Sequence, residues 1–439
     1  MPESIEPPVS ASSASTVHAQ PRADGHYRWV ICALLFFAAT INYMDRQIIG
    51  LLKPILATEL HWSEGDYGQI VFCFQLAYAI GLFGIGGIID RIGVKTGFSL
   101  AVVLWSVAAA AHGFARSVGG FCVARFGLGL AEAGNFPASI KCVGDWFPKK
   151  ERALATGLFN SGTNVGALVT PLLVPWLHQN WGWPMAFFVT GSLGAAWIVA
   201  WWLLYEHPQR HPRVSAGELA WISSDPSDPP QKSSWAKLLL HRQTWAFALG
   251  KLLTDPFWWF YLFWIPSFLN DQFQVKVDPK EMGVPMFTIY AMASVGSVGG
   301  GWISSRLIRN GATVNRGRKS AMLVCAFAVV PIIFASRVSS LWISVLLIGL
   351  AAAAHQGFSA NLFTVVSDTV PRKAVGSVVG IGGMAGAIGG MVIAKIVGHV
   401  LQVTGKNYLL PFLMAGFAYL VALAVIHFIL PRLQPMEIE

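Results

Sequence analysis

The sequence predicts an all-α integral membrane protein in which twelve transmembrane helices form two pseudo-symmetric six-helix halves. Hydrophobic residues make up 54% of the 439 residues and charged residues only 12%, and mean hydropathy is positive. A soluble fold would leave much of that apolar surface in water. Apolar stretches of about 20 residues, the length a helix needs to cross the hydrocarbon, recur along the chain. None alternates like an outer-membrane β-strand.

The expected spans follow one another along most of the chain. They are 28–57, 66–89, 97–115, 119–146, 153–177, 183–205, 243–270, 284–305, 320–336, 340–367, 374–401 and 409–431. The only long polar segment, 206–242, separates the sixth span from the seventh. We therefore expect a first bundle over 27–205, a linker over 206–242 and a second bundle over 243–432.

The segments outside the spans predict the orientation. Residues 1–26 are rich in Ser, Pro and Ala and lack the apolar core of a secretory signal, so we expect a disordered cytoplasmic tail. With both termini and the linker in the cytoplasm, most of the 31 Lys and Arg residues face that side, as the positive-inside rule requires. Residues 433–439 form the second cytoplasmic tail. The net charge of +9 then indicates topology in a bilayer and not binding to nucleic acid.

The cysteines predict neither a disulfide framework nor a metal site, because all five lie in apolar spans without paired spacing. They are Cys32, Cys73, Cys122, Cys142 and Cys325. We interpret them as small core residues, and we expect no metal and no cofactor.

An internal repeat supports the division into halves. An offset of 223 positions aligns DWFPKKERALATGLFNSGTNVG, which begins at Asp145, with DTVPRKAVGSVVGIGGMAGAIG, which begins at Asp368. A second pair of similar segments, GGIIDRIGVK and GWISSRLIRNG, closes the second and eighth spans. Many secondary transporters consist of two related halves, with the substrate site at their interface near the bilayer midplane.

Several of these segments resemble the major facilitator superfamily. GGIIDRIGVK (86–95) is similar to the signature loop between its second and third helices, and 301–311 is similar to the weaker second copy. NYMDRQ, RFGLGLAEAGNFPA, TDPFWWFYLFW and AHQGFSANLF more narrowly resemble the anion:cation symporter branch, most closely its bacterial hexuronate transporters. The resemblance covers 27–432 and implies a sugar-acid carrier in the bacterial inner membrane.

The first span carries two adjacent charges, although a charge at bilayer depth is costly and usually functional. Asp45 and Arg46 point about 100° apart on a helix, so they cannot both face one small site. Arg46 is the better candidate for the substrate carboxylate and Asp45 for a proton site, as the resemblance also implies. Tyr43 lies three positions before Arg46 and can share its face. The alternative for Asp45 is an acid that stabilises helix packing.

The fourth span carries a second pair of charges. Arg125 and Glu132 are seven residues apart, so they share one helix face about 10 Å apart along the axis. The arginine offers a planar fork for a carboxylate, and a glutamate removed from water can take up and release protons. The alternative is a permanent Arg–Glu pair that joins helices.

The repeat places His355 where the first half has Glu132. A histidine can titrate near neutral pH or donate to a sugar hydroxyl, and it can equally be a packing group. Gln356 and Ser359 are neighbouring candidates for sugar hydroxyls, and Ser359 shares a helix face with His355.

The seventh span holds a cluster of aromatic residues beside two charges. The aromatic residues are Trp258, Trp259, Tyr261 and Trp264, and the charges are Lys251 and Asp255. Aromatic faces suit the C–H faces of a sugar, but we favour the alternative that most of them are anchors at the membrane interface. The two charges, four residues apart, can neutralise each other.

Further candidates rest mainly on the resemblance. It implies that Tyr78, Asn160 and Thr163 offer polar groups to sugar hydroxyls. Asp90, Arg91 and Arg306 lie at helix ends that we expect in the cytoplasm, where charge pairs can hold a gate shut.

Together these features predict a proton-coupled symporter that imports a sugar acid, such as galacturonate or glucuronate, by alternating access. Protonation of Asp45 and Glu132 would permit substrate binding. Alternatives are a carrier of another organic anion, such as galactonate or a dicarboxylate, exchange or facilitated diffusion, and a non-transporting sensor. We expect a sensor to carry a large additional soluble domain, and we find no catalytic motif of an enzyme. The expected partners are the sugar acid, protons and lipid, and the expected state is a monomer.

Overall fold

The computed structural model describes residues 24–224 and 235–436, except for a few side chains within these ranges. A first group of helices precedes the linker. It consists of α1 (Tyr27–Glu59), α2 (Glu64–Ile92), α3 (Val94–His112), α4 (Val118–Glu132), α5 (Asn135–Trp146), α6 (Lys149–Trp181) and α7 (Trp183–Leu204). Residues 1–23, most of the expected N-terminal tail, lie outside the described ranges.

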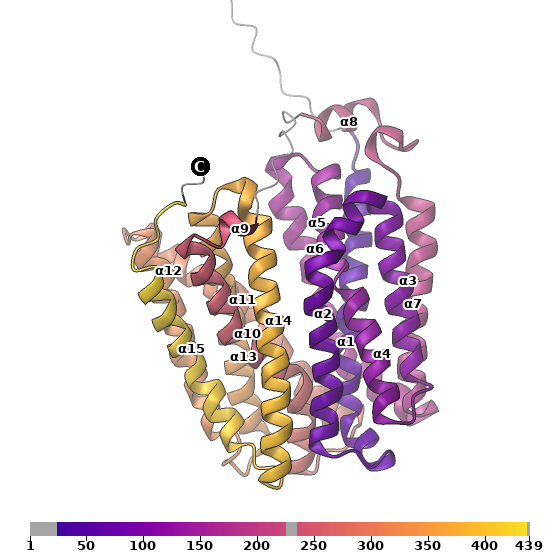
Figure 1. Cartoon of the computed structure of the whole chain (residues 1–439), viewed down its shortest axis with the longest axis vertical. Coiled ribbons are helices and arrows are strands. Elements are labelled where there is room, and N and C mark those ends of the chain that lie inside the picture. Colours follow the sequence, from indigo (N-terminus) through magenta and orange to yellow (C-terminus); the bar gives the residue numbers. More distant parts are fainter. Residues whose placement is uncertain (1–23, 225–234, 437–439) are drawn as a thin grey trace, which may run out of the picture.

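A second group follows the linker, and Figure 1 shows the two groups side by side. It consists of α10 (Arg242–Phe273), α11 (Val284–Arg309), α12 (Val314–Val329), α13 (Leu341–Thr369), α14 (Arg372–Val403) and α15 (Leu409–Ile429). Five short elements complete the described chain: η1 (Pro208–Arg210), α8 (Ala216–Ile222), α9 (Trp235–Leu238), η2 (Pro279–Gly283) and η3 (Val330–Phe334).

Helices lie at all the predicted spans, and in the described residues nine are long and apolar enough to cross a membrane. The fourth predicted span differs, because it is divided between α4 and α5, which have 15 and 12 residues. The break follows Glu132. Pro137 has no N–H to donate to the carbonyl of Ala133, and this loss favours a helix break there.

The helix connections follow from local capping. The α2 helix begins with a capping box, in which the Ser63 hydroxyl accepts from the Asp66 N–H at 3.1 Å and the Asp66 carboxylate accepts from the Ser63 N–H at 2.9 Å. Gly93 ends α2 and Gly182 ends α6, with φ of 83° and 82°. These left-handed conformations favour glycine and allow the chain to reverse within a single residue.

Glycines also set how closely the helices approach. A Cβ added to Gly162 on α6 would lie 2.2 Å from the Phe36 carbonyl oxygen of α1. One added to Gly300 on α11 would lie 2.3 Å from the Cα of Gly357 on α13. Backbones therefore touch within each group, as is typical of small residues at membrane helix interfaces.

The two groups meet along three helix pairs: α2 with α14, α1 with α10, and α6 with α11. A Cβ on Gly68 would lie 2.8 Å from the Ala394 carbonyl oxygen, and one on Gly50 would lie 2.8 Å from the Leu262 carbonyl oxygen. Both contacts lie toward the end of the molecule where α1 ends and α2 begins, which we call the distal end. The opposite end, where α1 and α10 begin, we call the linker end.

The distal end carries polar contacts that join the groups. The Tyr67 hydroxyl donates to the Phe263 carbonyl at 2.7 Å, and Gln179 donates to Asp278 at 2.5 Å. Lys406 contacts Asp271 of its own group at 2.6 Å and Glu64 of the other group at 4.0 Å. The groups are therefore held together at this end.

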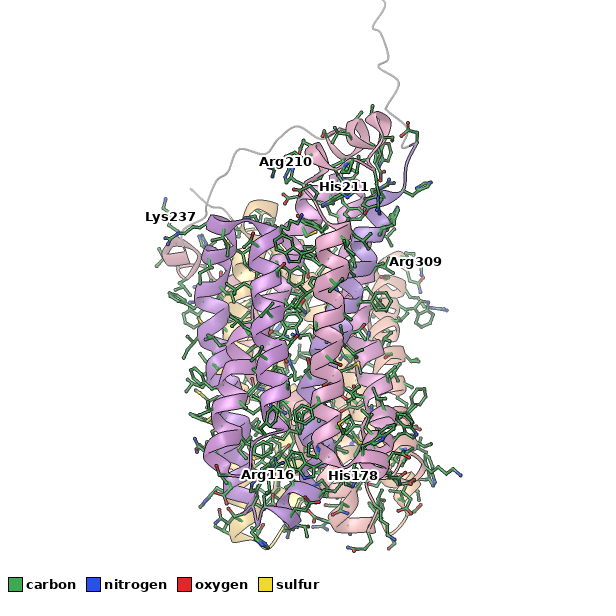
Figure 2. The ribbon with its side chains drawn as sticks, turned by 90° about the vertical axis from the view of Figure 1, so that its right-hand side faces the viewer. Arg116, His178, Arg210, His211, Lys237 and Arg309 are labelled. Carbon is green, nitrogen blue, oxygen red and sulfur yellow. The ribbon has the colours of Figure 1, made fainter. Side chains whose placement is uncertain are left out.

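The linker is partly helical and packs on the first group. The Glu218 carboxylate of α8 accepts the backbone N–H groups of Tyr27 and Arg28, both at 3.1 Å, and also the Arg28 guanidinium. Arg28 pairs in turn with Glu151 of α6 at 2.8 Å. Figure 2 shows Arg210, His211 and Lys237 at this end, with Arg116 and His178 at the other.

The described part of the C-terminal tail packs on the second group. The Leu433 N–H donates to the Asn315 side chain at 3.2 Å, and the Met436 N–H donates to the Thr369 carbonyl at 2.6 Å. Met436 is buried. The chain therefore remains bound to the helices up to this residue.

Candidate functional site

The centre of the candidate site is an ion pair between α1 and α4. The Glu132 Oε2 atom accepts from Arg46 Nε at 2.9 Å and from a terminal Arg46 nitrogen at 2.8 Å. Both side chains are buried, and Asn42 accepts a further hydrogen bond from Arg46 at 3.3 Å. The sequence offered a permanent Arg–Glu pair between helices as an alternative, and the described ion pair of Glu132 is with Arg46 of a different helix and not with Arg125.

Four aromatic rings surround the Arg46 guanidinium. Their centroids lie 4.8–5.3 Å from its central carbon, and the rings belong to Tyr43, Phe74, Tyr78 and Trp259. Three rings come from the first group, and Trp259 comes from α10 in the second. The structure therefore brings the predicted Tyr43 and Tyr78 to Arg46 and adds contacts that stabilise a cation.

Arg125 of α4 contacts the backbone of α1 at Arg46. One of its terminal nitrogens donates to the Arg46 backbone carbonyl at 3.3 Å, while its Nε and other terminal nitrogen have no partner among the described residues. It is 1% exposed, and the Phe74 and Phe263 rings lie 5.5 and 6.0 Å away. A buried guanidinium with free donors is suited to bind an anion.

Asp45 is buried beside this cluster and belongs to none of the described ion pairs. It is 1% exposed, and the Thr190 hydroxyl of α7 lies within reach of its carboxylate. Arg46 uses a different face of α1 for its pair with Glu132, as the 100° rotation predicts. The two adjacent charges therefore have different surroundings.

His355 lies inside the second group. Its Nδ1 atom is 2.7 Å from the Tyr419 hydroxyl, and its ring stacks on Trp258 with centroids 5.1 Å apart. The Tyr419 hydroxyl also lies 3.4 Å from the Thr254 carbonyl. These contacts support the packing alternative for His355. Gln356 is half-buried and Ser359 buried, and no described hydrogen bond involves either side chain.

The aromatic residues of α10 are buried, so the prediction that most of them are interfacial anchors was wrong. Trp258, Trp259, Tyr261 and Trp264 are all at most 8% exposed. An anchor would be exposed to the lipid headgroups. Instead these rings pack between helices: Trp258 stacks on His355, and Trp264 meets Tyr67 of α2 edge to face.

Lys251 and Asp255 pair with each other at 2.8 Å, one turn apart on α10. The Lys251 ammonium also lies 4.8 Å from the centre of the Phe363 ring. A Cβ on Gly386 of α14 would lie 2.3 Å from an Asp255 oxygen, so α14 covers the pair closely. The two charges neutralise each other, which was the alternative to a role in substrate binding.

The structure does not bring two predicted residues of α6 to Arg46. The Asn160 side chain is exposed, and the Thr163 hydroxyl donates to the Asn160 carbonyl of its own helix at 2.7 Å. Their role stays a prediction.

The predicted gating residues lie at the linker end. Arg91 is exposed at the end of α2, and Arg306 is exposed with its guanidinium 5.1 Å from the Trp302 ring. No described ion pair involves either arginine. The Asp90 side chain lies outside the described part of the chain, so this predicted gate remains a prediction. The described residues also hold no cluster of three or more potential metal ligands.

Sequence reasoning missed two buried amides, Gln47 and Gln75. Each is at most 1% exposed, and all four amide atoms lack a partner among the described residues. The signal for Gln75 was present in the sequence. It is a polar residue inside an apolar span, three positions before Tyr78, and such residues share a helix face.

Comparison with known proteins identifies the family. The sequence matches the Major Facilitator Superfamily over residues 35–394. The chain belongs to this superfamily. It is therefore a membrane transport protein and not an enzyme.

Its relatives within the superfamily include several named sugar-acid transporters. A hexuronate transporter of Escherichia coli (strain K12) is 30% identical over 91% of this chain and 93% of its own length. A galacturonate transporter of Dickeya chrysanthemi is 32% identical over 63% of this chain and 81% of its length. A D-galactonate transporter of Escherichia coli O6:H1 is 27% identical over 86% and 90%.

The fold also matches a solved structure. A crystal structure of a bacterial homolog to the human lysosomal transporter Spinster, in an inward-facing and unoccupied conformation, superposes with a TM-score of 0.70. It covers 93% of this chain and 96% of that chain at 20% identity, so the likeness shows the fold alone.

Proposed function

We propose that the protein is a proton-coupled symporter that imports a sugar acid, and that this sugar acid is a hexuronate such as galacturonate or glucuronate. One observation carries this proposal: a buried Arg46–Glu132 pair sits inside a cage of aromatic rings that includes Trp259 from the other group. The relatives named as hexuronate and galacturonate transporters support the substrate class.

The Arg46–Glu132 pair links protons to substrate. Glu132 is paired with the Arg46 guanidinium that would bind a substrate carboxylate. Glu132 and the substrate therefore compete for Arg46. A proton on Glu132 removes its charge and frees the guanidinium for the substrate. Arg125, with free donors close to the Arg46 backbone, offers a second contact for the same carboxylate.

Asp45 is the second proton site. No described ion pair involves Asp45, so it can hold a proton in the arrangement described without breaking one. When the substrate leaves and Arg46 pairs again with Glu132, the protons are released on the side to which the cavity opens.

Alternating access requires two bodies that move relative to each other. We propose that the groups over 27–205 and 243–432 are these bodies, each with six transmembrane helices. In addition to the nine apolar helices, α4 with α5, α6 and α10 would then cross the bilayer. Of these, the fourth span is divided between two short helices, α10 carries Lys251 and Asp255, and α6 carries polar residues such as Asn160 and Asn164.

The distal end would face outward and the linker end the cytoplasm, in the bacterial inner membrane. Arg210, Lys237 and Arg309 at the linker end support this orientation (Figure 2). The contacts across the distal end then correspond to a closed outer side. The relatives include a D-galactonate transporter and a probable galactarate/D-glucarate transporter. The alternative substrate is therefore another sugar acid of one of these classes.

The test is uptake of labelled galacturonate into proteoliposomes with and without an inward proton gradient, with galactonate and galactarate as competitors. We expect accumulation only with the gradient. Glu132→Gln should retain binding and exchange but lose accumulation, because an amide mimics the protonated acid. Accumulation by this variant at the normal rate would contradict the role of Glu132, and accumulation without a gradient would contradict proton coupling.

A further inference from the structure

Gln75 on α2 has an unusual environment. It is 0% exposed, and neither its amide nitrogen nor its amide oxygen has a partner among the described residues. A buried polar atom without a hydrogen-bond partner destabilises the folded protein. An amide left with two such atoms is explained if a ligand supplies the missing hydrogen bonds.

The position of Gln75 connects it to the Arg46 cage. Tyr78, one turn later on α2, has its ring 4.8 Å from the Arg46 guanidinium carbon. Trp259, whose ring is 5.1 Å from the same carbon, approaches Gln75 from the second group. A Cβ on Gly390 of α14 would lie 3.0 Å from the Gln75 amide carbon and 3.1 Å from the Trp259 indole nitrogen.

Three helices thus converge on one point beside Arg46. The residue contributed by α14 is Gly390, and its missing side chain leaves room for the Gln75 amide and the Trp259 indole edge. The indole N–H of Trp259 takes part in no described hydrogen bond. The amide supplies one acceptor and two hydrogens to donate, and the indole supplies one more donor.

We propose that Gln75 and Trp259 form a neutral subsite that binds a hydroxyl group of the sugar acid while Arg46 binds its carboxylate. This inference rests on the proposed function and specifies its substrate class. A hydroxyl both donates and accepts, which matches an amide, whereas a carboxylate only accepts. The aromatic face of Trp259 suits the C–H face of the sugar ring.

The subsite therefore selects for a single carboxylate. In a dicarboxylate such as galactarate, the second carboxylate can accept from the Gln75 amide and the Trp259 indole, but no described cation at this point neutralises its charge, and the amide oxygen is left without a donor. A hexuronate or aldonate, with hydroxyls along the chain, satisfies it. The protein should bind galacturonate more tightly than galactarate, and Gln75 should contribute to the difference.

The experiment measures binding to the purified protein in detergent by titration calorimetry. The ligands are galacturonate, each monodeoxy galacturonate and galactarate. Gln75→Leu should weaken galacturonate about tenfold, because one ligand hydroxyl loses its hydrogen bonds. At least one monodeoxy galacturonate should bind the wild type and Gln75→Leu with equal affinity, since it lacks the hydroxyl that Gln75 reads.

Gln69→Leu is the matched control. It makes the same substitution on the same helix, where Gln69 interacts with Lys395 and Cys73 near the distal end. It should leave the affinity pattern unchanged. If Gln75→Leu is not monodisperse, Gln75→Asn replaces it, since the shorter amide should lose most of the same discrimination.

Unchanged galacturonate affinity in Gln75→Leu, or equal weakening of every ligand, would overturn the subsite, because a packing role affects all ligands alike. A wild-type protein that binds no sugar acid would refute the proposed function itself. If the wild type binds galacturonate, but Gln75→Leu changes the affinity for every monodeoxy galacturonate by the same factor as for galacturonate, only the subsite is refuted.

Discussion

The repeat relates two buried side chains that the molecule surrounds very differently. Glu132 in the first group pairs with Arg46 and lies near a second arginine, Arg125. His355, its counterpart at the offset of 223, is held by the Tyr419 hydroxyl and the Trp258 ring. The first position thus holds a glutamate in an ion pair with an arginine. The second holds a histidine that is hydrogen-bonded to a tyrosine within an aromatic cluster.

This difference shows how two related halves can divide one task. In the mechanism we propose, one proton on Glu132 in the first group would change which anion Arg46 binds. In the second group, Lys251 and Asp255 neutralise each other, and His355 already has a partner. We infer that proton coupling resides in the first group and that the second contributes packing and aromatic surface.

The largest expected effect comes from Arg46→Ala. It removes the cage cation and leaves Glu132 buried without its partner, which costs about 3–5 kcal/mol in similar cases. We expect sugar-acid affinity to fall at least hundredfold and the melting temperature to drop. Arg309→Ala, at an exposed position, is the control. Wild-type affinity in a direct binding assay of Arg46→Ala would remove this arginine from the site.

A double variant separates binding from stability. In Arg46→Ala with Glu132→Ala, no unpaired buried charge remains, so the melting temperature should partly recover while binding stays lost. Recovery of binding as well would show that Glu132 alone had blocked the site.

Asp45→Asn should have the second largest effect, and it should affect transport alone. Because no described ion pair involves Asp45, and an amide oxygen can still accept from the nearby Thr190 hydroxyl, a neutral amide of the same shape should change the melting temperature little. Gradient-driven accumulation should fall strongly, since the second proton site is lost. A large drop in melting temperature with normal accumulation would instead identify Asp45 as a packing acid.

His355→Ala tests the other half of the comparison. The change removes the hydrogen bond to Tyr419 and the stacked contact with Trp258, so the protein should lose about 2–4 kcal/mol of stability. Substrate affinity should remain within about threefold of the wild type at every pH. Melting temperature and affinity are measured on one preparation. A shifted pH profile of uptake would return His355 to the transport pathway.

The smallest expected effect is that of Lys406→Ala at the distal end. Lys406 is half exposed, so its contacts with Asp271 and Glu64 are screened, and uptake should change less than about fivefold. Raising the salt concentration should reduce the difference between variant and wild type. A larger effect that persists at high salt would show that this contact controls opening of the distal end.

The contact between Lys406 and Asp271 depends on pH through the charge of Lys406. Burial opposes the charged form, but the hydrogen bond and charge of Asp271 raise the pKa of Lys406 above its ordinary value of 10.5. Lys406 therefore carries its charge at neutral pH and loses it as pH rises through that raised pKa. A change in uptake between about pH 5 and 8 must come from other groups.

Apolar stretches predicted the positions of the spans, except for the break in the fourth, and helix geometry predicted that Asp45 and Arg46 face different directions. The sequence did not predict the partner of Glu132. Spacing along one helix offered Arg125 only as an alternative partner, while the distance between α1 and α4 depends on how the helices pack. The prediction that residues such as Trp258 and Trp264 are interfacial anchors was wrong for a related reason. The sequence of an aromatic-rich apolar helix does not distinguish a surface covered by lipid from one covered by protein.

Gln75 shows an intermediate case. Its place on the helix face of Tyr78 follows from the sequence, but its lack of a partner does not. That lack depends on Gly390, which is distant in sequence and contributes no side chain to the contact. Spacing rules describe residues that are present, and they do not identify the empty space that a glycine leaves on a neighbouring helix.

The contact of Glu218 with the start of α1 has a consequence for biosynthesis. The carboxylate that caps the Tyr27 and Arg28 amides lies about 190 residues later in the chain. Ribosomes make residues in order, so the first turn of α1 remains without this cap until α8 has been synthesised. The first bundle is therefore complete only after the first part of the linker has been made and has packed on α1.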